Sequence, residues 1–476
     1  MERVNVWTTY EESDLAELDL IVEEYKDCLD LGKTERECVV LAVKMAEGNG
    51  YVNLKDVISE GKLLKAGDKV YAVCMDKSIV LFQIGTKSLS EGMNILGAHI
   101  DSPRIDVKQN PLYESEELAY LDTHYYGGIK KYQWVTIPLA IHGIVVKTDG
   151  TKVSISIGEK EDDPVFCITD LLVHLAARQL EKKASVVIEG EGLDLLIGSR
   201  PYAKKENCED ENEDVKEKDA EEKKATVTQN VLRLLEEMYG IEEKDFVSAE
   251  LEIVPAGKAR DLGLDRSMIM AYGQDDRVCA FTSLFAMLDT EPQEKTTCCI
   301  LVDKEEIGSV GATGMKSRFF ENVIAELVAL TEGESELKVR RALANSRMLS
   351  SDVSAAYDPM YGENFEKRSS AFFGNGLVFN KFTGSRGKSG SNDANAEYLA
   401  ELRAMMDEKK VAYQFAELGK VDIGGGGTIA YIMANYGMEV IDSGVAVLSM
   451  HAPWEVTSKA DVYEAYKGYK AFLELA

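Results

Sequence analysis

TTCCILVDKEEIGSVGATG, residues 296–314, is the stretch that decides the fold of this chain. Its apolar first half is typical of a buried strand. Two adjacent acidic residues, Glu305 and Glu306, follow that strand and precede a glycine-rich loop. Adjacent carboxylates are costly to place beside a core unless a partner compensates their charge. The stretch therefore predicts a buried strand whose end carries chemistry.

The same pattern recurs in both directions along the chain. The apolar segment NILGAHI leads into His99, RMLSSD ends at Asp352, and GVAVLSMH is expected to be a strand that ends at His451. An apolar helix, RVCAFTSLFAML, follows Asp275. Alternating strands and helices favour a mixed, largely parallel α/β sheet flanked by helices. Ligands bind at the carboxyl ends of such strands, where these residues lie.

The middle of the chain has a different character and predicts an inserted, smaller β-rich domain. IPLAIHGIVVKTDGTKVSISIG reads as a β-hairpin with its turn near Asp149 and Gly150. DLLVHLAARQLEKKA reads as a helix that carries His174. An almost purely charged run at about residues 203–227 predicts a solvated, flexible loop.

These patterns divide the chain into two domains. Residues 1–106 and 255–476 are expected to form one discontinuous domain. It contains all of the acidic signatures, which are the segments that carry His99, Asp275, Glu305, Glu306, Asp352 and His451. Residues 107–254 are expected to form the insertion. A closing amphipathic helix begins near Ser458, and Asp461 suits a capping box with that serine.

Composition limits the partners and the compartment. With 54 Lys and Arg against 83 Asp and Glu, the net charge is −29, which disfavours nucleic acid as a partner. The eight cysteines form no CxxC pair and lie mostly in apolar stretches, as in a reducing cytoplasm. We expect no signal peptide and no membrane span, because no basic or long apolar segment of the required kind occurs. The expected location is cytoplasmic.

The candidate site residues combine imidazole and carboxylate groups. Only five histidines occur in 476 residues, and two of them, His99 and His451, lie in these signatures. This ligand set favours zinc, with cobalt or manganese as competitors. Taken together, the residues suit two divalent ions that share a bridging carboxylate. One glutamate of the pair 305–306 could bind metal while the other removes a proton from water.

Each residue taken alone has a plainer interpretation. His99 and Asp101 could belong to a turn before Pro103. Asp275 and Asp276 could cap a helix, where carboxylates are favoured in any case. His451 could be a core histidine. The metal interpretation therefore depends on their occurring together.

The signatures, in this order and spacing, resemble the aspartyl aminopeptidase family of dinuclear zinc metallopeptidases, to which yeast vacuolar aminopeptidase I is related. The resemblance covers nearly the whole chain and implies a zinc-peptidase fold. It implies that His99, Asp275 and Asp352 hold one metal ion, and that Asp275, Glu306 and His451 hold the other. Glu305 would then be the general base, and Asp101 the carboxylate that orients a ligand. Asp275 is preferred to Asp276, because the first acid of the family's pair is the bridging ligand.

The resemblance also implies that the insertion is a dimerisation domain and that dimers assemble to a tetrahedral dodecamer. His174 would complete the active site of a neighbouring subunit and stabilise the oxyanion of the tetrahedral intermediate. Preference for N-terminal Asp or Glu in the peptide substrate would need a cation. Lys381 matches that position, with Arg386 and Lys388 as weaker candidates.

Other functions stay open at this point. The chain could be a broad or leucine-type aminopeptidase, or another dinuclear-zinc amide hydrolase such as a deacylase or a carboxypeptidase. A non-catalytic assembly protein is a more distant alternative, which predicts decayed metal ligands, whereas every expected ligand is present.

Overall fold

The computed structural model describes residues 4–202 and 226–475. The chain forms two compact units, one made of Met1–Pro103 and Lys258–Ala476, the other of Arg104–Gly257. The charged run at about 203–227 lies almost entirely outside the described residues. The catalytic and dimerisation roles expected for the two parts stay predictions.

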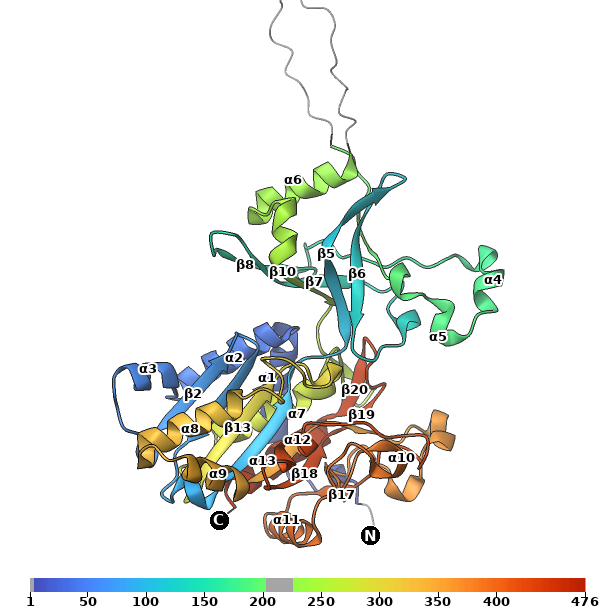
Figure 1. Cartoon of the computed structure of the whole chain (residues 1–476). Coiled ribbons are helices and arrows are strands. Elements are labelled where there is room, and N and C mark those ends of the chain that lie inside the picture. Colours follow the sequence, from blue (N-terminus) through green and yellow to red (C-terminus); the bar gives the residue numbers. More distant parts are fainter. Residues whose placement is uncertain (1–3, 203–225, 476) are drawn as a thin grey trace, which may run out of the picture. The chain divides into compact units, whose positions relative to one another are not determined.

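The first unit is built on a nine-stranded mixed sheet (Figure 1). Its four central strands, β13, β4, β14 and β18, are parallel to one another, and the outer strands include antiparallel pairs. This arrangement confirms the prediction of a mixed sheet with a parallel centre. The strands, in spatial order, are β1 (Val52–Asn53), β2 (Lys69–Cys74), β3 (Ser78–Gln83), β13 (Thr296–Val302), β4 (Met93–His99), β14 (Arg347–Ser351), β18 (Glu439–Gly444), β16 (Leu377–Asn380) and β17 (Tyr413–Phe415).

Helices cover both faces of this sheet because its central strands are apolar on both sides (Figure 1). On β4, Ile95 points into one hydrophobic core and Leu96 into the other, as expected from the two-residue period of a strand. The core that contains Leu96 includes residues of α1 (Glu12–Leu31), α2 (Glu35–Gly48), α7 (Gln274–Leu288), α11 (Ala396–Glu408) and α13 (Lys459–Leu473). The core that contains Ile95 includes residues of α3 (Leu54–Ser59), α8 (Phe319–Glu332), α9 (Glu336–Ala344) and α12 (Ala430–Ala434).

A second, five-stranded sheet of the first unit carries further site residues. Strand β12 leads directly into α7, and the turn between β19 and β20 contains His451. The strands, in spatial order, are β11 (Arg260–Leu262), β12 (Met268–Ala271), β20 (Glu455–Ser458), β19 (Ala446–Leu448) and β15 (Ser354–Ala355).

The second unit is a six-stranded antiparallel sheet accompanied by α6 (Val227–Tyr239) (Figure 1). The predicted hairpin is confirmed, since β7 and β8 pair antiparallel on either side of Asp149 and Gly150. The strands, in spatial order, are β8 (Lys152–Ile157), β7 (Leu139–Val146), β10 (Ala249–Pro255), β5 (Arg104–Ser115), β6 (Leu118–Tyr126) and β9 (Leu195–Gly198).

Two local predictions are wrong. The single helix expected around His174 is broken into the 3-10 turn η4 (Val173–Leu175), α4 (Ala177–Leu180) and α5 (Ala184–Val187). Ala176 is the only buried residue in 171–187, so no packed face supports a continuous helix.

The capping box at the closing helix also does not form. Ser458 is the N-cap of α13 but makes no side-chain cap bond. Asp461 accepts hydrogen bonds from the backbone N–H groups of Gly374 and Gly376 instead. Donors from a distant loop have therefore replaced the local partner that the sequence suggested.

Within the described part of the chain, no helix combines the length and apolar character needed to cross a bilayer.

Candidate metal centre

The parallel centre of the nine-stranded sheet brings three of the candidate segments to one edge. His99 is the last residue of β4, and Asp352 directly follows β14. Glu305 and Glu306 begin the 3-10 turn η7 (Glu305–Ile307), which follows β13. Since these strands are neighbours and run in the same direction, their carboxyl ends meet.

The other two candidates come from the smaller sheet. Asp275 lies in the first turn of α7, just after β12, where its backbone is not helical. His451 lies in the turn between β19 and β20. The strand expected to run to His451 ends at Leu448. His451 has a φ of 64°, a left-handed conformation that a strand cannot contain.

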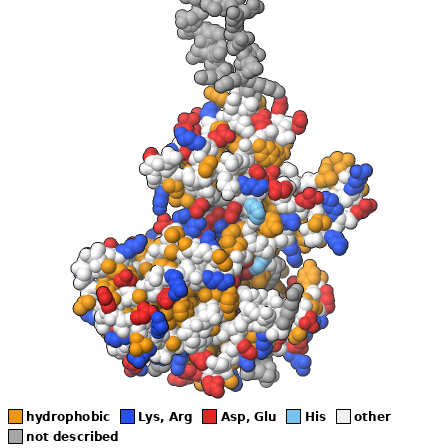
Figure 2. Space-filling model, viewed as in Figure 1, with side chains coloured by type: hydrophobic (Ala, Val, Ile, Leu, Met, Phe, Trp, Pro, Cys, Tyr) orange, Lys and Arg blue, Asp and Glu red, His pale blue; other side chains and the backbone are white. Residues whose placement is uncertain are grey.

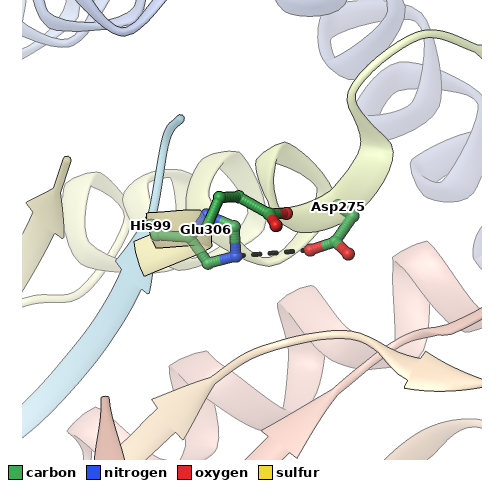
Figure 3. A group of neighbouring side chains, drawn as sticks. All are labelled: His99, Asp275 and Glu306. Atoms are coloured by element: carbon green, nitrogen blue, oxygen red, sulfur yellow. Dashed lines mark ion pairs between the residues drawn. The ribbon is translucent and has the colours of Figure 1, made fainter. Parts of the chain in front are cut away.

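Asp275 lies between the two histidines. One of its carboxylate oxygens is 3.2 Å from Nε2 of His99, and the other is 3.2 Å from Nε2 of His451. Figure 3 shows the carboxylate turned toward the His99 ring, with Glu306 beside them. Oδ1 of Asp352 is 4.0 Å from Nε2 of His99, and Oε1 of Glu306 is 3.5 Å from Nε2 of His451. The carboxylate thus has the two-sided placement of a bridging ligand.

The donor atoms fit divalent metal ions. His99, Asp275 and Glu306 each offer a ligand atom, and these atoms lie within 4.8 Å of one another. Oε1 of Glu306 is buried without a hydrogen-bond partner, which is costly unless a cation is bound there. Imidazole nitrogen and carboxylate oxygen together suit zinc, cobalt or manganese.

Asp276 forms a second spatial group with His99 and Asp352. One oxygen of Asp276 accepts the backbone N–H of His99 at 3.4 Å. Burial, together with the charge of Asp275, raises the pKa of Asp276 well above its ordinary value, although His99 opposes this shift. Asp276 therefore lies beside the first candidate metal position, whereas Asp275 faces both histidines.

Asp101 is fully buried and contacts both His99 and the backbone of the glutamate pair. Nδ1 of His99 is 2.9 Å from the backbone oxygen of Asp101 and 3.3 Å from its carboxylate. Such a contact fixes the tautomer of a ligand imidazole so that Nε2 is free to bind metal. The carboxylate also accepts the backbone N–H groups of Glu305 at 3.1 Å and Glu306 at 3.2 Å. This second contact was not foreseen from the sequence.

Glu305 has the properties of a general base. Its Oε2 lies 3.9 Å from Nε2 of His99, so it is near the candidate metal position. Burial raises the pKa of Glu305 to about 7, with His99 opposing the shift and Asp101 adding to it. A pKa near neutrality suits a group that must both take up and release a proton.

The pKa values of several candidate ligands are raised in the site without metal. Burial lowers the pKa of His99, but hydrogen bonds to Asp101 and Asp275 outweigh burial and raise the pKa well above its ordinary value. Burial also raises the pKa values of Glu306 and Asp352 well above their ordinary values. Because ligands bind metal in their deprotonated forms, metal binding at this site is expected to depend on pH.

The candidate ligands and Glu305 line a cavity of about 450 Å³. The cavity is of the size that small-molecule and substrate sites have. The remaining lining residues come mostly from glycine-rich and strand-end segments: Gly308, Ser309, Val353, Ser354, Asn380, Thr383, Leu418, Gly425, Gly426, Gly427, Thr428, Tyr431, Asp442 and Met450.

Two candidates lie apart from this cluster. Nζ of Lys381 is 3.6 Å from Asp393, which also binds Lys388 at 2.8 Å, and neither lysine lines the cavity. The side chain of Arg386 lies outside the described part of the structure. His174 is exposed on η4 of the second unit.

The sequence interpretation missed Glu455, which contacts the backbone of two candidate ligands. Glu455 lies four residues after His451, within the segment MHAPWEV. That four-residue spacing was a usable signal. It also missed Asp442, a buried carboxylate that lines the cavity and accepts the hydroxyl of Ser350 at 3.0 Å.

Comparison with known sequences places these residues in context. The family described as Aminopeptidase I zinc metalloprotease (M18) matches residues 29–473. A Clostridium acetobutylicum protein named "Probable M18 family aminopeptidase 1" is 59% identical over 472 residues, which cover 99% of this chain and 98% of the relative. A Thermotoga maritima protein of the same name is 44% identical over 475 residues, covering 100% and 99%.

Solved structures share the fold over the whole chain. The Thermotoga maritima M18-family aminopeptidase superposes with a TM-score of 0.90 at 43% identity, covering 100% of this chain and 99% of that one. Aminopeptidase I of Clostridium acetobutylicum gives 0.89 at 57% identity, covering 99% of both chains. The dodecamer of mApe1 from S. cerevisiae gives 0.75 at 20% identity, covering 96% and 97%, and shares the fold.

Proposed function

Because this chain belongs to the M18 family of aminopeptidase I zinc metalloproteases and is a metal-dependent aminopeptidase, we propose which of its residues bind metal and which transfer protons when an N-terminal amino acid is removed. The resemblance inferred from the sequence motifs is confirmed. The observation that carries the proposal is the placement of Asp275, whose two oxygens each face one imidazole at 3.2 Å.

We assign two divalent ions to each chain. His99, Asp275 and Asp352 would hold one ion, and Asp275, Glu306 and His451 the other. Zinc is the expected metal, with cobalt or manganese as alternatives. When bound, the ions would lower the pKa of water and polarise the scissile carbonyl group.

Glu305 would move the proton in both halves of the reaction. Its carboxylate would accept the proton of the attacking water as the new C–O bond forms. The protonated side chain would then donate this proton to the leaving nitrogen as the C–N bond breaks. Asp101 would keep His99 in one tautomer and hold the backbone of Glu305 in place, as its contacts support.

A panel of substrates tests the reaction class. The chain is first treated with a chelator and then given zinc, cobalt or manganese. Aminoacyl chromogenic substrates should be cleaved, whereas N-acyl amino acids and peptides with a blocked N-terminus should not. Cleavage confined to N-acyl amino acids would favour a deacylase. A chain that binds metal and cleaves none of these substrates would favour an assembly protein.

Preference for acidic N-terminal residues is the finer proposal, and Lys381 is the cation that would recognise them. Its amino group would have to exchange Asp393 for the substrate carboxylate. We expect Lys381→Ala to lower kcat/KM for aspartyl and glutamyl substrates about tenfold or more, since a charge pair is lost. The rate with a leucyl substrate should stay within about twofold of wild type.

Lys388→Ala is the matched control, because Lys388 also binds Asp393. If only Lys388→Ala lowered kcat/KM for aspartyl and glutamyl substrates, Lys388 would be the cation that recognises them. Equal wild-type rates with aspartyl and leucyl substrates would instead establish a broad or leucine-type aminopeptidase.

We further propose that the chain forms dimers through its second unit and that these dimers assemble to a tetrahedral dodecamer. The solved structure of mApe1 from S. cerevisiae is described as a dodecamer. His174 would enter a neighbouring active site, where its imidazole would stabilise negative charge on the substrate oxygen. Exposed apolar side chains surround it, namely Leu171, Leu172, Val173, Leu175 and Leu180. Orange side chains at the surface of the segment that carries α4 are visible in Figure 2, and such patches mark contact surfaces.

Subunit complementation tests the role of His174. Chains with His174→Ala and chains with Glu305→Gln should each be inactive alone. Co-expressed, they should recover about a quarter of wild-type activity, since random pairing gives half mixed dimers with one intact site each. His124→Ala, which alters another exposed histidine of the same unit, should leave activity unchanged. Absence of recovery in verified mixed oligomers would argue against a role in a neighbouring site.

We propose a cytoplasmic location because the thiols are free. The cysteines within the described residues are all free, and most are buried, as is usual in a reducing compartment. Cys208 lies outside the described residues. The net charge of −29 disfavours nucleic acid as a partner.

A further inference from the structure

We infer that Glu455 is a positioning residue that holds the two segments carrying Asp275 and His451 at the spacing that metal binding requires. This inference rests on the proposed metal site. It assigns a function to a side chain that contributes no metal ligand.

The geometry joins one carboxylate to two ligand residues. Oε2 of Glu455 accepts the backbone N–H of Asp275 at 2.9 Å, and Oε1 accepts the backbone N–H of His451 at 2.7 Å. Glu455 is only 1% exposed, so water does not compete for these bonds. The carboxylate therefore connects the first turn of α7 to the turn between β19 and β20.

Neither N–H group has its partner in regular secondary structure. Asp275 lies in the first turn of α7, where backbone N–H groups have no partner within the helix. His451 lies in a turn, with a left-handed φ of 64°. A buried backbone N–H without an acceptor is costly, so Glu455 stabilises both conformations.

Glu455 is itself held rigidly. It is the first residue of β20 and pairs with Ala271 of β12. Its backbone oxygen accepts a hydrogen bond from Nε2 of Gln274 at 2.7 Å, and the same nitrogen lies 3.2 Å from the backbone oxygen of Ile269. The five-stranded sheet thus fixes the carboxylate, and the carboxylate fixes the ligands.

A carboxylate is the side chain that this position needs. Both of its oxygens accept hydrogen bonds, whereas an amide has one accepting oxygen and would turn its NH₂ group toward the second N–H. Glu455→Gln can therefore hold one of the two segments but not both. Glu455→Asp keeps both acceptors and the charge but is one methylene shorter, so it should also fail to reach both segments.

Asp461 offers a matched control for Glu455. It is also fully buried, and its two oxygens accept the backbone N–H groups of Gly376 at 2.7 Å and Gly374 at 2.9 Å. These bonds hold a loop that carries none of the candidate ligands. Asp461→Asn therefore reports what the loss of such a carboxylate does to the fold alone.

The test measures zinc affinity of the full chain by competition with a chelator, the metal content, and the unfolding temperature of the metal-free protein. We expect Glu455→Gln to weaken zinc binding about 10- to 100-fold, the range seen when an outer-shell partner of a ligand is lost. Asp461→Asn should lower the unfolding temperature but leave zinc affinity within about twofold of wild type. Glu455→Asp should weaken zinc binding as well. If Glu455→Gln does not fold, the zinc affinity of Glu455→Asp decides the test.

Equal zinc affinity in Glu455→Gln and wild type would overturn the inference. So would wild-type affinity in Glu455→Asp, since the charge alone would then suffice. If the wild-type chain bound no zinc, cobalt or manganese, the proposed metal site itself would fail. If the wild type binds metal and both Glu455 variants bind it equally well, the positioning role alone fails.

Discussion

We expect Glu305→Gln to lower kcat by about 10²–10⁴-fold while the proposed metal ions stay bound, the range expected when a general base is removed. The reason is that glutamine fills the same volume but cannot accept the proton of the attacking water. Glu305 also lies 3.9 Å from Nε2 of His99, close to the proposed metal ligands. The measurement is steady-state turnover together with elemental analysis of the same sample.

The adjacent glutamate is the control for this prediction. Glu306→Gln removes a proposed ligand 3.5 Å from His451, so it should lose metal as well as turnover. Two identical substitutions at neighbouring positions should therefore give different metal contents. Near-normal activity in Glu305→Gln would contradict the mechanism, and loss of metal in that variant would make Glu305 a ligand.

The pH profile follows from the same role. A base acts only when deprotonated, so activity should fall as the pH falls through the pKa of Glu305. That pKa is about 7 in the protein without ions. Bound cations favour the carboxylate and lower its pKa, so the acid limb of wild-type activity should lie below this value. An acid limb above pH 7 would show that another group controls the reaction.

We expect Asp275→Ala to remove both proposed ions and to abolish turnover. Each oxygen of Asp275 faces one histidine at 3.2 Å, so a single substitution removes a ligand from both proposed positions. Zinc affinity should fall by more than the roughly 10- to 100-fold typical of an outer-shell change. By contrast, Asp352→Ala and His451→Ala should each remove one ion and leave the other.

Asp276→Asn is the matched control for this experiment. Asp276 follows Asp275 directly, but its carboxyl group accepts the backbone N–H of His99 and has a pKa raised well above the ordinary value. An amide oxygen can still accept the backbone N–H of His99, so this variant should keep both proposed ions. Metal lost from Asp276→Asn and retained in Asp275→Ala would assign the bridge to Asp276.

Much of the fold could be predicted because its signals are local. Apolar runs of strand length that alternate with helical segments indicate a largely parallel sheet, and the parallel pairing of β13, β4 and β14 agrees with this prediction. The helix around His174 failed for a physical reason. Its spacing is helical, but its side chains are exposed, and helices in proteins depend on packing.

The predicted site residues differ in how the structure places them. His99, Asp275, Glu306 and His451 come from four segments and meet within hydrogen-bond distances or slightly more. Lys381 lies beside Asp393, outside the cavity lining. Its assignment came from the resemblance to the family rather than from geometry. Its role, like that of His174, stays a prediction.

The sequence by itself determined the chemical types and the strand ends that carry them. Periodicity and residue type are local properties, and they are sufficient to place His99, Glu305 and Asp352 at the ends of strands. Tertiary structure alone decided which backbone groups the buried carboxylates hold. Asp101 binds the backbone of residues 305 and 306, and Glu455 binds that of residues 275 and 451. Most of these partners are far apart in sequence. Asp101 meets residues 305 and 306 because β4 and β13 are neighbours in one sheet, and Glu455 meets Asp275 because β20 pairs with β12 in the other.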